Sequence, residues 1–172
     1  MLFFAVTPDP ATAARITALA TLLRRRLGLA ERPVAADRLH VTLGGVGLYN
    51  RFSPAQLGRV LQAASSVRSP PFAVSFDRFA SFGAGENRPL VLLGEEGTTG
   101  LRRLAEAVGR PFGRPDWADA VPHMTMIRGH GPVHEEFLPT PIAWTTAEFV
   151  LIHRLRRRDR FEHRPLGRWP LA

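Results

Sequence analysis

Residues 38–47 read RLHVTLGGVG and residues 121–129 read VPHMTMIRG, so the chain contains the sequence His-x-Thr twice. In the first stretch, leucine and valine residues alternate with His40 and Thr42. A period of two is typical of a half-buried β-strand, so the apolar side chains are expected to face the core. The histidine and the threonine then share the opposite face of the strand.

Each His-x-Thr strand closes a similar series of predicted elements. The first half contains a strand at residues 2–7, a helix at residues 11–27, a loop with proline, and the strand that carries His40 and Thr42. The second half contains a strand at residues 90–93, a helix at residues 100–108, a proline-rich loop, and the strand that carries His123 and Thr125. Two copies of one supersecondary unit, related by an approximate twofold axis, would bring both His-x-Thr faces toward one cleft.

Turn and capping residues predict the remaining elements. SPAQ at residues 53–56 combines a serine cap, a proline at the first helical position and a capping-box glutamine, so a helix is expected to about residue 67. Residues 71–83 are expected to form a hairpin with the strand at residues 90–93. The tail predicts two further strands, at residues 142–155 and 161–171.

The composition excludes several classes of enzyme. The chain has 172 residues, all 23 of its Lys+Arg residues are arginine, and cysteine is absent. A Walker phosphate loop, a Schiff-base enzyme and a lysyl-adenylate ligase need lysine, and a thiol enzyme needs cysteine. The chain can use none of these mechanisms.

The charge of the chain favours an anionic partner. The formal net charge is +8 and the sequence pI is about 11.6. Such an excess is typical of proteins that bind nucleic acid, although a basic protein without such a partner stays open. The apolar run near the N-terminus is short, and no stretch reaches the roughly 18 apolar residues that a membrane span requires. We therefore expect a cytoplasmic protein with no membrane partner.

Two His-x-Thr strands facing one cleft suit substitution at phosphorus. In-line substitution needs a base on the attacking oxygen and an acid on the leaving oxygen, on opposite sides of the phosphorus atom. Histidine suits both roles because its ordinary pKa, about 6.5, keeps both protonation states accessible near neutral pH. Each threonine hydroxyl can donate a hydrogen bond to a phosphate oxygen. This chemistry requires neither a metal nor a cofactor.

The chain resembles the 2H phosphoesterase superfamily over nearly its whole length. The similarity lies in the opening LFFAV, in RPVAADRLHVTL through the first motif, in PHMTMIR at the second, and in EFVLIHRL and LGRWPL near the end. It looks more closely like the bacterial and archaeal RNA 2',3'-cyclic phosphodiesterases, also called 2'-5' RNA ligases. The resemblance implies an α+β fold with two pseudo-symmetric lobes, antiparallel sheets that line a central cleft, and helices outside. Residues 1–172 would form a single bilobal domain, and we expect a monomer.

The resemblance also implies a reaction and a role for each motif residue. Enzymes of this type open a 2',3'-cyclic phosphate to a 2'-phosphomonoester. His40 would be the general acid that protonates the departing 3' oxygen, and His123 the general base that activates water. Thr42 and Thr125 would hold the phosphate oxygens. Reverse 2'-5' ligation by a 5'-hydroxyl would need no ATP, which agrees with the absence of lysine.

Arg128 follows the second motif, where the family often has a basic residue. Strict alternation from His123 would turn the Arg128 side chain away from the cleft. It can therefore reach the phosphate only if the strand ends or bulges near Ile127. On that condition, Arg128 is a third candidate for phosphate binding.

Two regions depart from the family pattern. Gly44 and Gly45 stand where the family continues the first motif with a phenylalanine, so this end of the strand is expected to pack less tightly. His153 stands where the family often has serine; a surface or packing role is expected for it, with an extra imidazole near the site as the alternative. Phe3 and Phe4 are expected to lie in the core rather than to stack on RNA bases.

Two further features have competing interpretations. RRRDR, from Arg156 to Arg160, predicts a solvated turn, with a phosphate-contacting patch as the alternative. His130 and His134 cannot form a helical pair of metal ligands because glycine and proline separate them, so no metal site is predicted.

Two other functions stay open at this point. The substrate could be another small cyclic phosphate, such as a nucleotide or an ADP-ribose derivative, handled by the same residues. The protein could also be an RNA-binding module without catalysis, although binding alone would need arginines more than two matched imidazoles. The partner that we expect is an RNA with a 2',3'-cyclic phosphate end.

Overall fold

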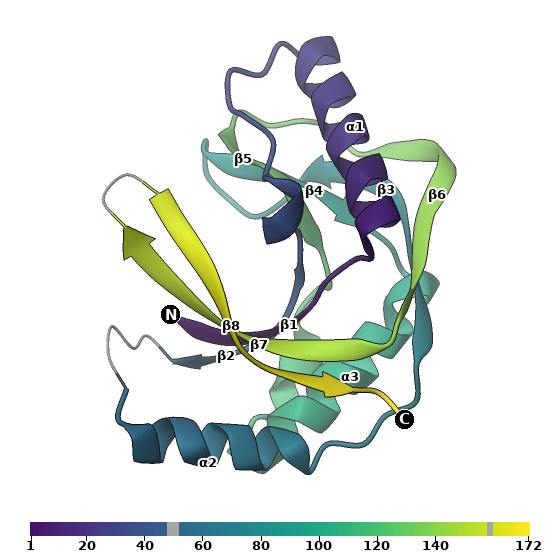
Figure 1. Ribbon diagram of the computed structural model, residues 1–172. Helices are drawn as coiled ribbons and strands as arrows, with labels where there is room; N and C mark the ends of the chain where they lie inside the picture. The colour runs from purple at the N-terminus through teal and green to yellow at the C-terminus, as the bar shows by residue number, and fades with distance from the viewer. Residues whose placement is uncertain (48–51, 158–159) are drawn as a thin grey trace.

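An eight-stranded antiparallel sheet and three α-helices are found in the computed structural model, which describes residues 1–47, 52–157 and 160–172 (Figure 1). The helices are α1 (Pro10–Arg26), α2 (Pro54–Ser65) and α3 (Thr99–Gly109). The strands are β1 (Leu2–Val6), β2 (Val41–Gly47), β3 (Phe72–Ser81), β4 (Arg88–Leu93), β5 (Met124–His130), β6 (Glu136–Thr146), β7 (Glu148–Arg157) and β8 (Arg160–Pro170). In this described part of the chain, no helix is both long and apolar enough to cross a membrane.

The sheet consists of two four-stranded halves with the same arrangement. Its strand order is β6-β3-β4-β5-β2-β1-β7-β8. The half β2-β1-β7-β8 meets the half β5-β4-β3-β6 where β2 pairs with β5, at Val41 and Met124. The predicted α+β fold with two similar lobes is confirmed, and the sheets of the two lobes are continuous through this pair.

The helices lie outside the sheet; α1 and α3 each contact the half of the sheet that they do not follow, whereas α2 follows β2 and contacts β8 in the same half. Helix α1 follows β1 but lies against β5 and β6, whereas α3 follows β4 but packs against β2 (Figure 1). The side chains that they contribute to the core, such as Ile16 and Leu104, are fully buried. The paired residues Val41 and Met124 are also fully buried, so they lie on the side of the sheet that faces this core.

Local sequence signals set the ends of the helices. Asp9 caps α1, because its Oδ1 accepts the Thr12 N–H at 2.9 Å. In the predicted capping box of α2, the Gln56 N–H donates to Ser53 Oγ at 3.1 Å and the Ser53 N–H donates to Gln56 Oε1 at 2.8 Å. Such a cap contributes about 1 kcal/mol. Gly28, just past the end of α1, has a φ of +63°, which glycine adopts without strain.

The tail of the chain differs from the prediction. The sequence predicts one strand at residues 142–155, but the structure contains two, β6 and β7, with a break at Ala147. β6 begins earlier, at Glu136, and pairs with β3, whereas β7 pairs with β1 in the other half. The prediction of one strand is wrong because the residues on both sides of the break favour strand, and only their partners distinguish them.

Gly44 is tightly packed, contrary to the expectation of a looser strand end. It is buried, and a Cβ atom built on it would lie 2.0 Å from the Trp117 ring. Trp117 is itself 7% exposed and stacks on Phe112. The indole therefore occupies the space that a larger residue at position 44 would need. At Gly45, by contrast, a Cβ atom would have no neighbour within 4 Å, as expected.

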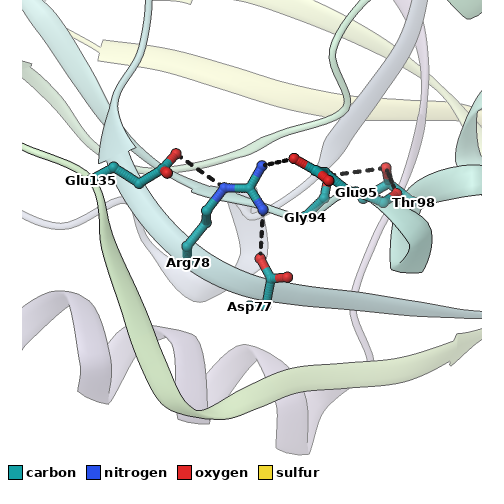
Figure 2. A network of polar contacts seen from close by, with 6 residues as sticks. All are labelled: Asp77, Arg78, Gly94, Glu95, Thr98 and Glu135. Atoms are coloured by element: carbon teal, nitrogen blue, oxygen red, sulfur yellow. Dashed lines mark hydrogen bonds and ion pairs between the residues drawn. The ribbon is translucent and has the colours of Figure 1, made fainter.

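Arg78 on β3 holds three carboxylates together (Figure 2). Its guanidinium lies 3.0 Å from Asp77 Oδ1, 3.1 Å from Glu95 Oε1 and 3.0 Å from Glu135 Oε2. Desolvation lowers the pKa of Arg78, but the charges of Asp77 and Glu135 and the hydrogen bonds to them together outweigh it, so the net direction is upward. The cluster joins β3 to the turn after β4 and to the segment before β6.

Candidate active site

His40 and His123 stand at matching positions, one residue before β2 and one residue before β5. Nδ1 of His40 lies 2.7 Å from the Arg38 carbonyl oxygen, and Nδ1 of His123 lies 2.9 Å from the Val121 carbonyl oxygen. A carbonyl oxygen can only accept, so each Nδ1 carries a proton and donates it. In both rings, Nε2 is therefore the nitrogen that can take up or release a proton.

Both histidines and both motif threonines belong to one face of the sheet. Val41 and Met124 pair with each other and point into the core, so the residues on either side of them point the other way. Extending this antiparallel register by one residue sets each motif threonine opposite the histidine of the other strand. Opposed residues have Cα separations of about 4.5–5.5 Å. The two predicted His-x-Thr pairs are thus brought together.

Two aromatic rings pack against the His40 ring. Its ring centroid lies 5.1 Å from that of Phe3 and 5.1 Å from that of His163, which meets it edge-on. Burial lowers the pKa of His40, its backbone hydrogen bond opposes this, and nearby cations, Arg128 first among them, lower the pKa further. Phe3 and Phe4 are 2% and 0% exposed, which confirms that they are core residues. Phe3 also supports the His40 ring.

His123 has a different aromatic neighbour. The Phe82 ring stacks on it, with the centroids 4.3 Å apart and an angle of 25° between the planes. Phe82 directly follows β3, in the turn that leads to β4. Nothing in the sequence near residue 82 indicates this contact, because it depends on how the β3–β4 hairpin packs beside β5.

A bulge in β5 changes the direction of Arg128. Thr125 and Ile127 pair with consecutive residues of β4, so the intervening Met126 has no partner of its own. Met126 and Ile127 are both fully buried, which shows that the alternation shifts by one residue here. The condition stated for Arg128 is therefore met, and its charge lies close enough to lower the pKa of His40.

His163 on β8 belongs to this site, and the sequence analysis missed it. Its ring packs against His40 and lies 5.7 Å from that of Phe3. Burial lowers the pKa of His163 to about 4, with further contributions from His40 and Arg128. The imidazole is therefore neutral at physiological pH. Only the pairing of β7 with β8 brings it beside His40, so no local pattern could have indicated it.

His153 lies on the other face of the sheet. It pairs with Leu2 across β1 and β7, whereas Ile152 pairs with Phe3, so His153 and Phe3 point in opposite directions. His153 is 7% exposed, and its ring meets the Phe52 ring edge-on at 4.9 Å. Of the roles considered for His153, the structure shows packing rather than a surface position or an approach to His40.

Two predictions fall wholly or partly outside the described residues. In the RRRDR cluster, residues 158–159 are outside them, as are the side chains of Arg157 and Arg160, so both interpretations of the cluster stay predictions. The His130 side chain is outside them as well, and His134 is exposed. Within the part of the chain that is described, no group of three or more His, Cys, Asp or Glu side chains could hold a metal ion.

Solved structures with the same fold include phosphoesterases. The crystal structure of E. coli LigT complexed with 3'-AMP superposes with a TM-score of 0.78, at 27% sequence identity over 99% of this chain and 97% of LigT. A second crystal structure, described as a phosphoesterase, has a TM-score of 0.78 and 25% identity over 99% of this chain and 98% of its own. TT0787 of Thermus thermophilus, at 20% identity and a TM-score of 0.78 over 99% of this chain and 97% of its own, shows the shared fold alone.

The family model of the 2'-5' RNA ligase superfamily matches residues 8–158. The chain belongs to this family, and the resemblance noted in the sequence is confirmed. A search among curated proteins found no significant match. The class of protein is therefore a 2H phosphoesterase, an enzyme that acts on phosphodiesters.

Proposed function

We propose that the protein is a metal-independent RNA 2',3'-cyclic phosphodiesterase, which opens 2',3'-cyclic phosphate ends to 2'-phosphomonoesters. The observation that carries this proposal is the matched pair of histidines. Each donates from Nδ1 to the carbonyl two residues earlier, and both belong to the face that also carries Thr42 and Thr125. Residues 1–172 act as one domain in this proposal, because each half of the sheet supplies one histidine.

In the proposed reaction, Nε2 of His123 takes a proton from water while the water oxygen attacks phosphorus. The bond between phosphorus and the 3' oxygen breaks, and the proton on Nε2 of His40 passes to that oxygen. The product carries a 2'-phosphate and a 3'-hydroxyl. Proton exchange with solvent then restores both histidines. With a 5'-hydroxyl in place of water, the same ring opening makes a 2'-5' linkage without ATP.

The proposed roles of Thr42, Thr125 and Arg128 concern the phosphate itself. The two hydroxyls donate to its nonbridging oxygens, and the guanidinium balances its charge. These interactions strengthen as negative charge builds up in the transition state. A bound phosphodiester anion also offsets the charge of Arg128 that lowers the pKa of His40. Substrate binding therefore favours the protonated His40 that the acid role requires.

The structures of a relative support a nucleotide-type substrate. E. coli LigT has been crystallised with 3'-AMP, with phosphate, with ATP and with NADP+. These complexes also favour a second candidate substrate, a mononucleotide cyclic phosphate, on which the same residues would act. The net charge of +8 favours the longer, more anionic RNA end as the first candidate.

A short RNA that ends in a 2',3'-cyclic phosphate, incubated in EDTA without ATP, tests the proposal. Phosphorus NMR should show a 2'-phosphomonoester. The product should be absent with His40→Ala and with His123→Ala, and present with the control His134→Ala, which changes an exposed histidine. A 3'-phosphate product, or activity that EDTA removes and a divalent ion restores, would overturn the mechanism. RNA binding without turnover would indicate a binding module instead.

A further inference from the structure

A basic cavity lies beside His40. Its volume is about 170 Å³, and its lining includes Arg32, Arg38, Arg128, Arg154, Phe161 and His163. These residues come from the loop before β2, from β5 and from the β7–β8 hairpin. The cavity is smaller than the roughly 300–1,000 Å³ typical of pockets for drug-sized ligands, so it suits one compact group.

The arginines of this cavity have no carboxylate partner in the part of the chain that the structure describes. Within the described residues, no ion pair joins Arg32, Arg38, Arg128 or Arg154 to an acidic side chain. Desolvation, and then the charges of Arg154 and Arg38, lower the pKa of Arg128. Like charges held this close repel one another unless an anion joins them. In the Arg78 cluster, by contrast, three carboxylates offset the charge of the guanidinium (Figure 2).

We infer that this cavity is a second phosphate subsite, which binds the phosphodiester next to the cyclic phosphate of an RNA end. The inference rests on the proposed function and names its substrate class. Guanidinium groups match phosphate because they donate two parallel hydrogen bonds. The cavity includes Arg128 and the ring of His163, which contacts His40. An anion in it would therefore lie directly beside the phosphate that His40 and His123 act on.

Contacts within the cavity hold one of the guanidiniums in place. The Cζ atom of Arg154 lies 3.8 Å from the centre of the Phe161 ring, within the range of a cation–π interaction. A guanidinium that is already positioned loses less conformational entropy when it binds a ligand. Phe161 is 41% exposed, so a base can also stack on its ring.

The surroundings of the cavity show where the anion belongs. A wider hollow of about 500 Å³ shares Arg38, Phe161 and His163 with the cavity and adds Asp37 and Glu162. Carboxylates in the hollow disfavour a phosphate there, so the arginine-lined cavity is the better place for the charge. The larger hollow suits a ribose or a base.

The subsite predicts a preference for oligonucleotides. A nucleoside 2',3'-cyclic phosphate with a free 5'-hydroxyl has one phosphate, which fills the catalytic site only. A dinucleotide with the same cyclic end has a second phosphate for the cavity. We expect kcat/KM for the dinucleotide to exceed that for the mononucleotide by about 10- to 100-fold, as one charged hydrogen-bonding contact can provide. High salt should reduce this preference.

The test compares both substrates in the wild type, in Arg38→Gln and Arg154→Gln, and in the control Arg103→Gln, whose arginine is exposed on α3. Each enzyme is measured at its own optimal pH, because the charge of Arg154 also affects His40. The ratio of kcat/KM for dinucleotide over mononucleotide should fall about tenfold in Arg38→Gln and Arg154→Gln, mainly through KM, and stay unchanged in the control. Circular dichroism shows whether each variant is folded.

Binding measurements separate the subsite from the proposed catalysis. Calorimetry with His123→Ala should show tighter binding of the dinucleotide than of the mononucleotide, without turnover. Equal kcat/KM for both substrates in the wild type, together with equal affinities, would overturn the subsite and leave the phosphodiesterase standing. Variants that weaken both substrates equally would overturn it too. Tighter dinucleotide binding with no turnover by the wild type would instead support the subsite and overturn the proposed function.

Discussion

The two halves of the sheet share a backbone plan but handle charge differently. In each half, a histidine stands just before a central strand, with its Nδ1 bound to the carbonyl two residues earlier. Beside His40, Arg38 and Arg154 line a cavity, and none of the described ion pairs joins either arginine to a carboxylate. In the half of His123, the arginine of β3, Arg78, is bound by three carboxylates (Figure 2). The repeated unit thus provides the proton-transfer geometry, whereas these arginines differ: Arg38 and Arg154 have no carboxylate partner among the described residues, and Arg78 has three.

Removing either histidine should have the largest effect, because the shared plan depends on both. His40→Ala and His123→Ala should each lower kcat/KM on an RNA 2',3'-cyclic phosphate by about 100- to 10,000-fold, since each deletes one proton-transfer group. Steady-state kinetics on folded protein measures this. A large loss at one histidine and a negligible loss at the other would contradict the equivalence of the two halves.

Thr42 and Thr125 test whether both halves of the sheet hold the phosphate. Thr42→Val and Thr125→Val should each lower kcat/KM by about 10- to 100-fold, the cost of losing a hydrogen bond to a charged group. Thr→Ser at the same positions keeps the hydroxyl and should retain most of the activity. If valine at only one position lowered kcat/KM, the phosphate would be held by one half alone.

His163 makes the stability of the His40 half dependent on pH. The pKa of His163 is about 4 in the folded protein, against an ordinary value of 6.5. Between these values the unfolded chain binds a proton that the folded protein does not, so the free energy of unfolding decreases as the pH falls. We expect a loss of about 2 kcal/mol from this group, less than the full pKa difference because the ring is partly exposed.

Denaturant unfolding at about pH 7 and about pH 4.5 measures this loss in the wild type and in His163→Gln. The variant should lose about 2 kcal/mol less stability between the two values. The same pH dependence in both proteins would show that His163 is not the source.

The smallest effect on activity is expected for Arg78, whose charge is offset by three carboxylates in the half of His123. Arg78→Met should lower the free energy of unfolding by about 1 to 2 kcal/mol and change kcat/KM less than about twofold, because the cluster is structural and its carboxylates stay partly hydrated. Arg154→Met should instead change the free energy of unfolding little and clearly lower kcat/KM on RNA. Thermal melts and kinetics on both variants test the contrast, which equal effects in both assays would contradict.

The repeated unit was predictable from sequence because its signals are local. Alternation identifies the strands of His40 and His123, and the Ser53 capping box identifies the start of α2. Arg128 marks the limit of such reasoning. Alternation shows that it needs a bulge, but Met126 and Ile127 are both apolar, so the sequence does not show where the bulge lies.

The surroundings of the histidines were not predictable, because they depend on pairing between distant segments. His163 meets His40 through β8, and Phe82 meets His123 through a hairpin turn. The same reason explains the wrong prediction of one strand at residues 142–155, whose two parts pair in different halves. Gly44 is a further case, since its tight packing comes from Trp117, far along the chain.

The pH dependence of kcat/KM tests most directly whether the two halves supply one acid and one base. The wild type should give a bell-shaped profile. His40→Ala should keep the rising acidic limb and lose the falling basic limb, because the group that must be protonated is gone. His123→Ala should keep the basic limb and lose the acidic one. A bell-shaped profile that persists in either variant, or limbs lost in the opposite sense, would contradict the assignment of His40 as acid and His123 as base.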